Sequence, residues 1–111
     1  MKITREDRGG IVVLRLDGSL IGGEAEGESL SKAVQDVTDG GSWRILMDLT
    51  GVPFINSMGL GFLVVNFVRL RRESGDLKLL NPSGRVKALM ETVPHLFEIF
   101  FDEKEALESF Q

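Results

Sequence analysis

The sequence contains no cysteine and only one histidine, His95. The missing thiols exclude disulfides, thiolate zinc sites and cysteine nucleophiles, and they fit a reducing cytoplasm, where we expect the protein to reside. His95 has no second His or Cys with which to share a metal ion, so we interpret it as a surface or loop residue. We therefore expect neither a metal nor a cofactor.

Long apolar runs and an excess of positive charge are also missing. The longest strongly apolar stretch, residues 58–68, is interrupted by Asn66 and is shorter than the roughly 20 residues of a membrane-spanning helix. The charged segment MKITREDRGG has no apolar core of the kind found in secretory signals. Thirteen Lys and Arg against seventeen Asp and Glu leave a formal net charge of −4, spread along the chain. We expect no nucleic-acid partner and no direct membrane insertion.

The sequence does contain an alternation of strand and helix patterns. In residues 11–17, the apolar side chains of Val12, Leu14 and Leu16 alternate with Val13, Arg15 and Asp17, which is the period-2 pattern of a strand. The Gly9-Gly10 turn before this strand predicts an antiparallel hairpin with residues 2–6. Residues 43–49 are almost continuously apolar, which is typical of a strand covered on both faces. Further strands are predicted at 77–80 and 97–101, and helices at 24–38, about 57–72, 84–93 and from 102 onward.

These elements predict an α/β fold: a mixed central sheet of about five strands with an N-terminal antiparallel hairpin and about four helices. The later strands are expected to run parallel, joined by right-handed crossovers. We expect a single domain spanning residues 1–111. The opening strand would form an edge of the sheet, which leaves pairing with a second copy, and hence a homodimer, open.

The segment from Val52 to Gly61 leaves the apolar strand and enters a helix. Asn56 or Ser57 can cap that helix, because either side-chain oxygen can accept a hydrogen bond from a first-turn amide. Gly59 and Gly61 each cost about 1 kcal/mol relative to alanine in a helix, which indicates a close approach by a neighbouring strand or by a partner's backbone. Ser57 would stand beyond the end of a parallel strand, where a phosphate is stabilised by the helix dipole.

The chain resembles the STAS domains, whose founding members are the bacterial anti-sigma factor antagonists. Nearly the whole chain carries the resemblance, in the segments 14–18, 45–49, 54–61, 79–83 and 100–107. The resemblance implies that a partner kinase phosphorylates Ser57. It also implies that the unphosphorylated domain binds an anti-sigma factor with a histidine-kinase-like ATPase domain, and that a serine phosphatase reverses the modification. The partner-binding residues implied in this way are Ile21, Asn56, Ser57, Met58, Gly59 and Leu60.

Three positions depart from the family pattern. Asn56 replaces the usual Asp, Met58 replaces the usual Ser or Thr, and Ile21 stands near the place where an acid is often found. The missing acids at Asn56 and near Ile21 reduce the local charge. Two alternatives stay open: Ser57 as a helix cap that is not modified, and the chain as a constitutive STAS subunit of a membrane-associated transport or signalling assembly.

We do not expect an enzyme. A triad of Ser57, His95 and an acid would need a Gly-x-Ser-x-Gly turn, and Ile55 stands where the first glycine should be. Paired acids could indicate a glycosidase, but the spacing of the candidates does not support one. We interpret these carboxylates as strand and helix residues: Asp48, Asp102, Glu103 and Glu105.

Overall fold

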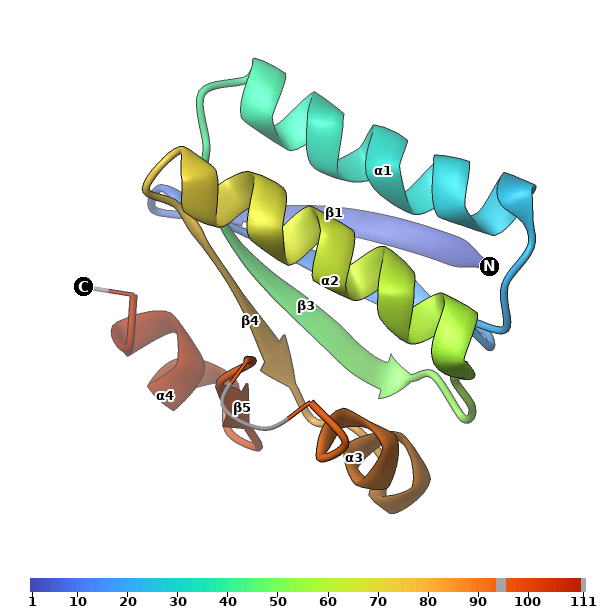
Figure 1. Ribbon diagram of the computed structural model, residues 1–111. Coiled ribbons are helices and arrows are strands. Elements are labelled where there is room, and N and C mark those ends of the chain that lie inside the picture. The colour runs from blue at the N-terminus through green and yellow to red at the C-terminus, as the bar shows by residue number, and fades with distance from the viewer. Residues whose placement is uncertain (94–95, 111) are drawn as a thin grey trace.

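The computed structural model describes residues 1–93 and 96–110, apart from the side chains of residues 24 and 26. Five strands form one sheet in the order β1-β2-β3-β4-β5, with β1 and β2 antiparallel and the other neighbours parallel. The expected mixed α/β fold with an antiparallel hairpin is confirmed (Figure 1). The elements are β1 (Lys2–Arg8), β2 (Ile11–Asp17), α1 (Glu24–Asp39), β3 (Arg44–Gly51), α2 (Ser57–Arg72), β4 (Asp76–Leu80), α3 (Gly84–Met90), β5 (Ile99–Phe100) and α4 (Glu103–Glu108).

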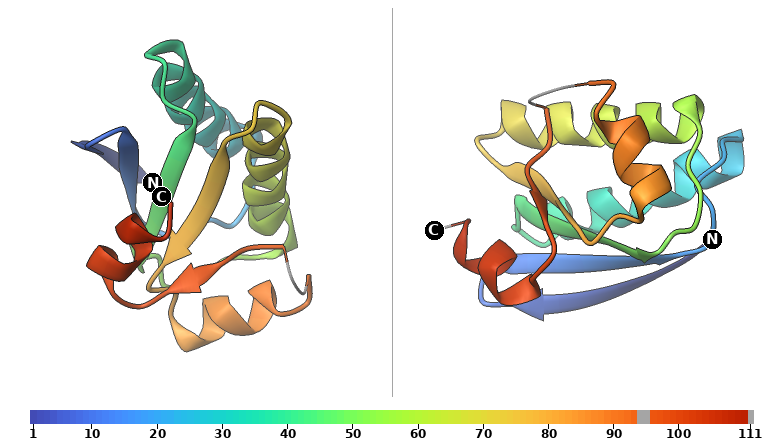
Figure 2. Two further views of the ribbon diagram at one scale, coloured as in Figure 1. Left: turned by 90° about the vertical axis from the view of Figure 1, so that its left-hand side faces the viewer. Right: turned by 90° about the horizontal axis from the view of Figure 1, so that it is seen from below.

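Side-chain alternation along the strands creates two cores on the two faces of the sheet. The larger core lies under α1 and α2, which run side by side over one face (Figure 1). The smaller core lies under α4 on the opposite face (Figure 2). Strand β3 contributes to both cores, which explains its continuous apolar sequence. The smaller core contains Ile11, Val13, Leu46, Leu80, Ala106 and Phe110.

Two predicted elements are shorter than expected. Helix α3 ends at Met90 rather than near residue 93, because residues 92 and 93 donate to carbonyls three residues back, which tightens the chain into a turn. Strand β5 covers two residues rather than 97–101. Its partner β4 ends at Leu80, and Asn81 then adopts φ 56°, which turns the chain away from the sheet.

Other expectations concern single side chains. Phe101, which follows β5, is 59% exposed, whereas the adjacent Phe100 packs against the smaller core. The prediction for His95 falls outside the described residues. Within the described part of the chain, we find no helix with both the length and the apolar character needed to cross a bilayer.

Candidate functional site

The two loops that follow β2 and β3 support the N-terminus of α2. They run side by side and are joined by three backbone hydrogen bonds: Gly18 N–H to Gly51 O at 3.0 Å, Leu20 N–H to Phe54 O at 3.0 Å and Asn56 N–H to Leu20 O at 3.3 Å. Leu20 and Ile55 are buried and form an isolated parallel bridge. The start of α2 is therefore held on an extension of the sheet.

Asn56 is the N-cap of α2, as one of the two sequence alternatives proposed. Its Oδ1 accepts a hydrogen bond from the Gly59 amide at 2.9 Å, and its Nδ2 donates a hydrogen bond to the Ile21 carbonyl. An ionised aspartate could make the first of these bonds but not the second, because a carboxylate has no hydrogen to donate. The amide at position 56 therefore joins the loop after β2 to the helix.

Ser57 is the first residue of α2 and is exposed. The first four amides of a helix have no intrahelical acceptor, and they give this end a partial positive charge. The Asn56 side chain satisfies the Gly59 amide, so Ser57 does not have to serve as the cap. The hydroxyl of Ser57 is therefore accessible at a position where added negative charge is favourable.

Apolar side chains surround Ser57 at the molecular surface. Ile21 is 48% exposed, Phe54 39% and Met58 59%. The Met58 sulfur accepts a hydrogen bond from the Gly23 amide at 3.4 Å, so this exposed side chain lies against the loop before α1. We call the residues Ile21, Phe54, Asn56, Ser57 and Met58 the Ser57 surface.

The two remaining residues of the predicted partner site, Gly59 and Leu60, are buried. A Cβ on Gly59 would lie 2.0 Å from the Leu20 carbonyl oxygen, so this glycine permits the close approach of the loop after β2. A Cβ on Gly61 would have nothing within 4 Å among the atoms described. Gly59 and Leu60 thus lie beneath the Ser57 surface and support it. Of the two glycines for which a close approach was predicted, only Gly59 is closely approached by another segment of the described chain.

A second polar cluster, which sequence analysis did not anticipate, lies on the face of the sheet that carries α4. Arg15 Nη1 lies 2.8 Å from an oxygen of Asp48 and 2.8 Å from an oxygen of Glu103, and Arg15 Nε donates to Glu6. Asp48 also accepts from the Thr50 hydroxyl at 2.5 Å and from its amide at 3.0 Å. We call Glu6, Arg15, Asp48 and Glu103 the Arg15 cluster.

The electrostatics of the Arg15 cluster are balanced internally. Hydrogen bonds from Arg15 hold the pKa of Glu6 below its ordinary value. Burial raises the pKa of Asp48, but hydrogen bonds from Thr50 and Arg15 outweigh it, so the net shift is downward. Hydrogen bonds to Glu103 first, and then to Glu6 and Asp48, raise the pKa of Arg15. The cluster joins four elements: the hairpin strands β1 and β2, the central strand β3 and the helix α4. We therefore interpret its role as structural.

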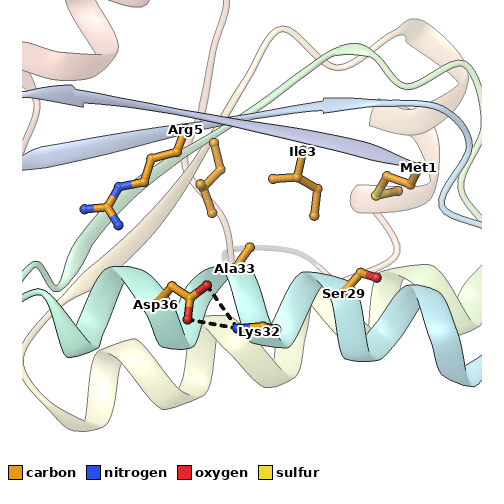
Figure 3. Close-up of a pocket in the computed structure, with 8 residues that line it drawn as sticks. Met1, Ile3, Arg5, Ser29, Lys32, Ala33 and Asp36 are labelled. Carbon is orange, nitrogen blue, oxygen red and sulfur yellow. Dashed lines mark hydrogen bonds and ion pairs between the residues drawn. The ribbon is translucent and has the colours of Figure 1, made fainter.

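A groove of about 450 Å³ lies between β1 and α1 (Figure 3). Ile3, Leu14 and Ala33 give it apolar walls, and the ion pair of Lys32 with Asp36, at 3.3 Å, lies along its α1 side. No residue of the Ser57 surface lines this groove. It therefore does not contribute to the predicted site.

The fold and the site define a small α/β domain whose long helix α2 begins with two exposed residues, Ser57 and Met58. The family model of the STAS domain matches residues 2–107, so the chain belongs to the STAS domain family, and the resemblance seen in the sequence is confirmed. Among curated proteins, the chain is 28% identical to BtrV of Bordetella bronchiseptica, named a candidate anti-sigma factor antagonist. That match covers 100 residues, 90% of this chain and 76% of BtrV.

Solved structures show the same architecture. A candidate anti-sigma factor antagonist from Thermotoga maritima is 21% identical, with a TM-score of 0.85, and the match covers 97% of this chain and 93% of that one. The unphosphorylated form of the anti-sigma factor antagonist SpoIIAA is 25% identical, with a TM-score of 0.71, over 97% of this chain and 96% of that one. SpoIIAA of Bacillus has also been solved in its phosphorylated form, with a TM-score of 0.77 and 21% identity over 99% of this chain and all of that one.

The fold also occurs within larger proteins. The murine anion transporter Slc26a9 matches 78% of this chain with 14% of its own length, at 19% identity and a TM-score of 0.66. A STAS fold by itself therefore does not distinguish a regulator from part of a transporter. BtrV and SpoIIAA match this chain over most of their own lengths, so the chain has the fold of an anti-sigma factor antagonist.

Proposed function

We propose that the chain is a partner-switching regulator that binds a kinase-type anti-sigma factor through the Ser57 surface and is released when Ser57 is phosphorylated. The observation that carries the proposal is the exposed hydroxyl of Ser57 at the first position of α2, surrounded by exposed apolar side chains. The similarity to BtrV and SpoIIAA supports an anti-sigma factor as the partner. The domain acts by binding and needs no catalytic residue of its own.

Phosphorylation of Ser57 would change binding without disturbing the fold. A phosphate adds a charge of about −1.5 to −2 at neutral pH, and it would be stabilised by the free amides and the positive end of the α2 dipole. The same charge would stand among Ile21, Phe54 and Met58, where an apolar partner surface has to exclude water. A partner that contacts this surface would lose affinity, because it would have to desolvate the phosphate.

The test uses the purified chain with a purified anti-sigma factor that has a histidine-kinase-like ATPase domain. We expect the complex to form, and we expect ATP to add the mass of one phosphoryl group to the chain. Peptide mapping should place that group on Ser57. Ser83, which is also exposed at a helix N-terminus, is an internal control and should stay unmodified.

Two variants complete the test. Ser57→Ala should bind constitutively and resist modification, and its fold should be intact because Asn56 caps the helix. Ser57→Asp should bind more weakly, because it places a permanent negative charge on the surface. Absence of both the complex and the modification would contradict the proposal. Co-purification with a transporter from native cells, with Ser57 unmodified, would instead support the constitutive STAS subunit.

A further inference from the structure

Arg85 lies in the first turn of α3, beside the Ser57 surface. Its guanidinium carbon is 5.7 Å from the centroid of the Phe54 ring, in cation–π geometry. Arg85 is exposed, and among the described residues no carboxylate lies within ion-pair distance of it. Arg15, in contrast, has three carboxylate partners. The charge of Arg85 is therefore available to a partner molecule.

We propose that Phe54 and Arg85 extend the docking surface, and that the protein partner carries a carboxylate opposite Arg85 next to an apolar contact. This inference rests on the proposed function and specifies the chemistry of the partner. The described side chains of the Ser57 surface are apolar or neutral, and Arg85 brings a formal positive charge to its edge through the contact with Phe54. A partner carboxylate gains from this cation, whereas a partner cation is repelled by it.

The contact with Phe54 draws the guanidinium of Arg85 towards the Ser57 surface. The N–H groups of a guanidinium can donate two parallel hydrogen bonds to one carboxylate, so Arg85 can bind a partner acid in this way. The chain as a whole carries a net charge of −4, so the attraction of an acidic partner would be local to this surface.

The same arrangement gives phosphorylation a second way to weaken the complex. A partner carboxylate seated near Arg85 and a phosphate on Ser57 would bring like charges to one docking surface, and their repulsion is strongest within the Debye length, about 8 Å at physiological ionic strength. Phosphorylation would then add like-charge repulsion to the desolvation of the phosphate. Salt should lower the affinity of the unphosphorylated chain, because its attraction at Arg85 is electrostatic.

Calorimetric titration of the full chain with the kinase-type anti-sigma factor tests the inference. We expect Arg85→Glu to weaken binding about 10-fold or more, Arg85→Lys to retain part of the affinity, and Phe54→Leu to cost a few-fold. Arg72→Glu is the matched control, since it changes the net charge equally at an exposed arginine about 22 Å along α2 from Ser57. It should bind within about two-fold of the unmodified chain. Circular dichroism should show that all variants are folded.

The outcomes separate the two proposals. If the unmodified chain binds and Arg85→Glu binds as tightly as Arg72→Glu, the inference about Arg85 is overturned and the proposed function stands. If the unmodified chain does not bind the anti-sigma factor, the proposed function fails and this inference fails with it. Recovery of Arg85→Glu binding by an acid-to-lysine change in the anti-sigma factor would identify the carboxylate and support the inference.

Discussion

The Arg15 cluster and the Ser57 surface both present polar groups, and they differ in whether those groups are satisfied within the chain. In the Arg15 cluster, one guanidinium contacts three carboxylates from β1, β3 and α4, so its interactions are completed within the chain. At the Ser57 surface, a neutral hydroxyl is surrounded by exposed apolar side chains, and the nearby Arg85 has only an aromatic ring for a partner among the described residues. Polar groups that are satisfied within the chain stabilise the fold, whereas accessible ones are hydrated and stay available to a partner.

The largest expected effect comes from the glycine beneath the Ser57 surface. Gly59→Ala would place a Cβ 2.0 Å from the backbone oxygen of Leu20, which cannot move without breaking the loop pairing. We expect it to lower the free energy of unfolding by at least about 3 kcal/mol in urea denaturation. Gly61→Ala is the matched control on the same helix, in open space, and should raise stability by about 1 kcal/mol. Equal effects of the two substitutions would contradict this account of the site.

The next largest effect tests the Arg15 cluster. Arg15→Ala would leave the carboxylates of Glu6, Asp48 and Glu103 close together without their common cation. The side chain of Arg15 is 30% exposed, so we expect a loss of about 2 kcal/mol, below the range for fully buried pairs. Urea unfolding monitors the loss. Affinity for the anti-sigma factor should change little if the cluster is structural, and a large loss of binding by a folded variant would show that the two regions are not independent.

Lowering the pH should destabilise the fold through the Arg15 cluster, whereas the Ser57 surface contains no carboxylate that would respond. The pKa values of Glu6 and Asp48 are lower in the folded chain than in the unfolded chain, so protonation favours unfolding. Their stabilisation is complete at neutral pH and is lost as the pH falls through about 4 towards the lower folded values. Urea titrations between neutral and acidic pH should therefore show declining stability. Arg15→Ala should flatten that decline, because the cluster's arginine is a cause of both shifts; an unchanged slope would contradict the assignment.

Local patterns in the sequence are sufficient to predict the order of strands and helices and the exposure of Ser57. Apolar spacing predicts each element, and residue type narrows the cap of α2 to Asn56 or Ser57. The structure selects Asn56. Contacts between distant residues are not encoded in such patterns. Arg15 and Glu103 are 88 residues apart, and Asn56 and Ile21 are 35 apart. For the same reason Gly59 and Gly61 look equivalent in the sequence, and only the position of the Leu20 carbonyl separates them.

The smallest expected effect concerns the departure of Asn56 from the family pattern. Asn56→Asp keeps the acceptor for the Gly59 amide and gains a favourable interaction with the helix dipole, but it loses the donor to the Ile21 carbonyl. These effects oppose each other, so stability should change by less than about 1 kcal/mol. Hydrogen exchange should nevertheless become faster in the loop around Ile21. Asn56→Ala, which loses both bonds, should cost about 1–2 kcal/mol, and equal exchange rates at Ile21 in the Asp variant and the unmodified chain would show that the amide donor is not what holds this loop.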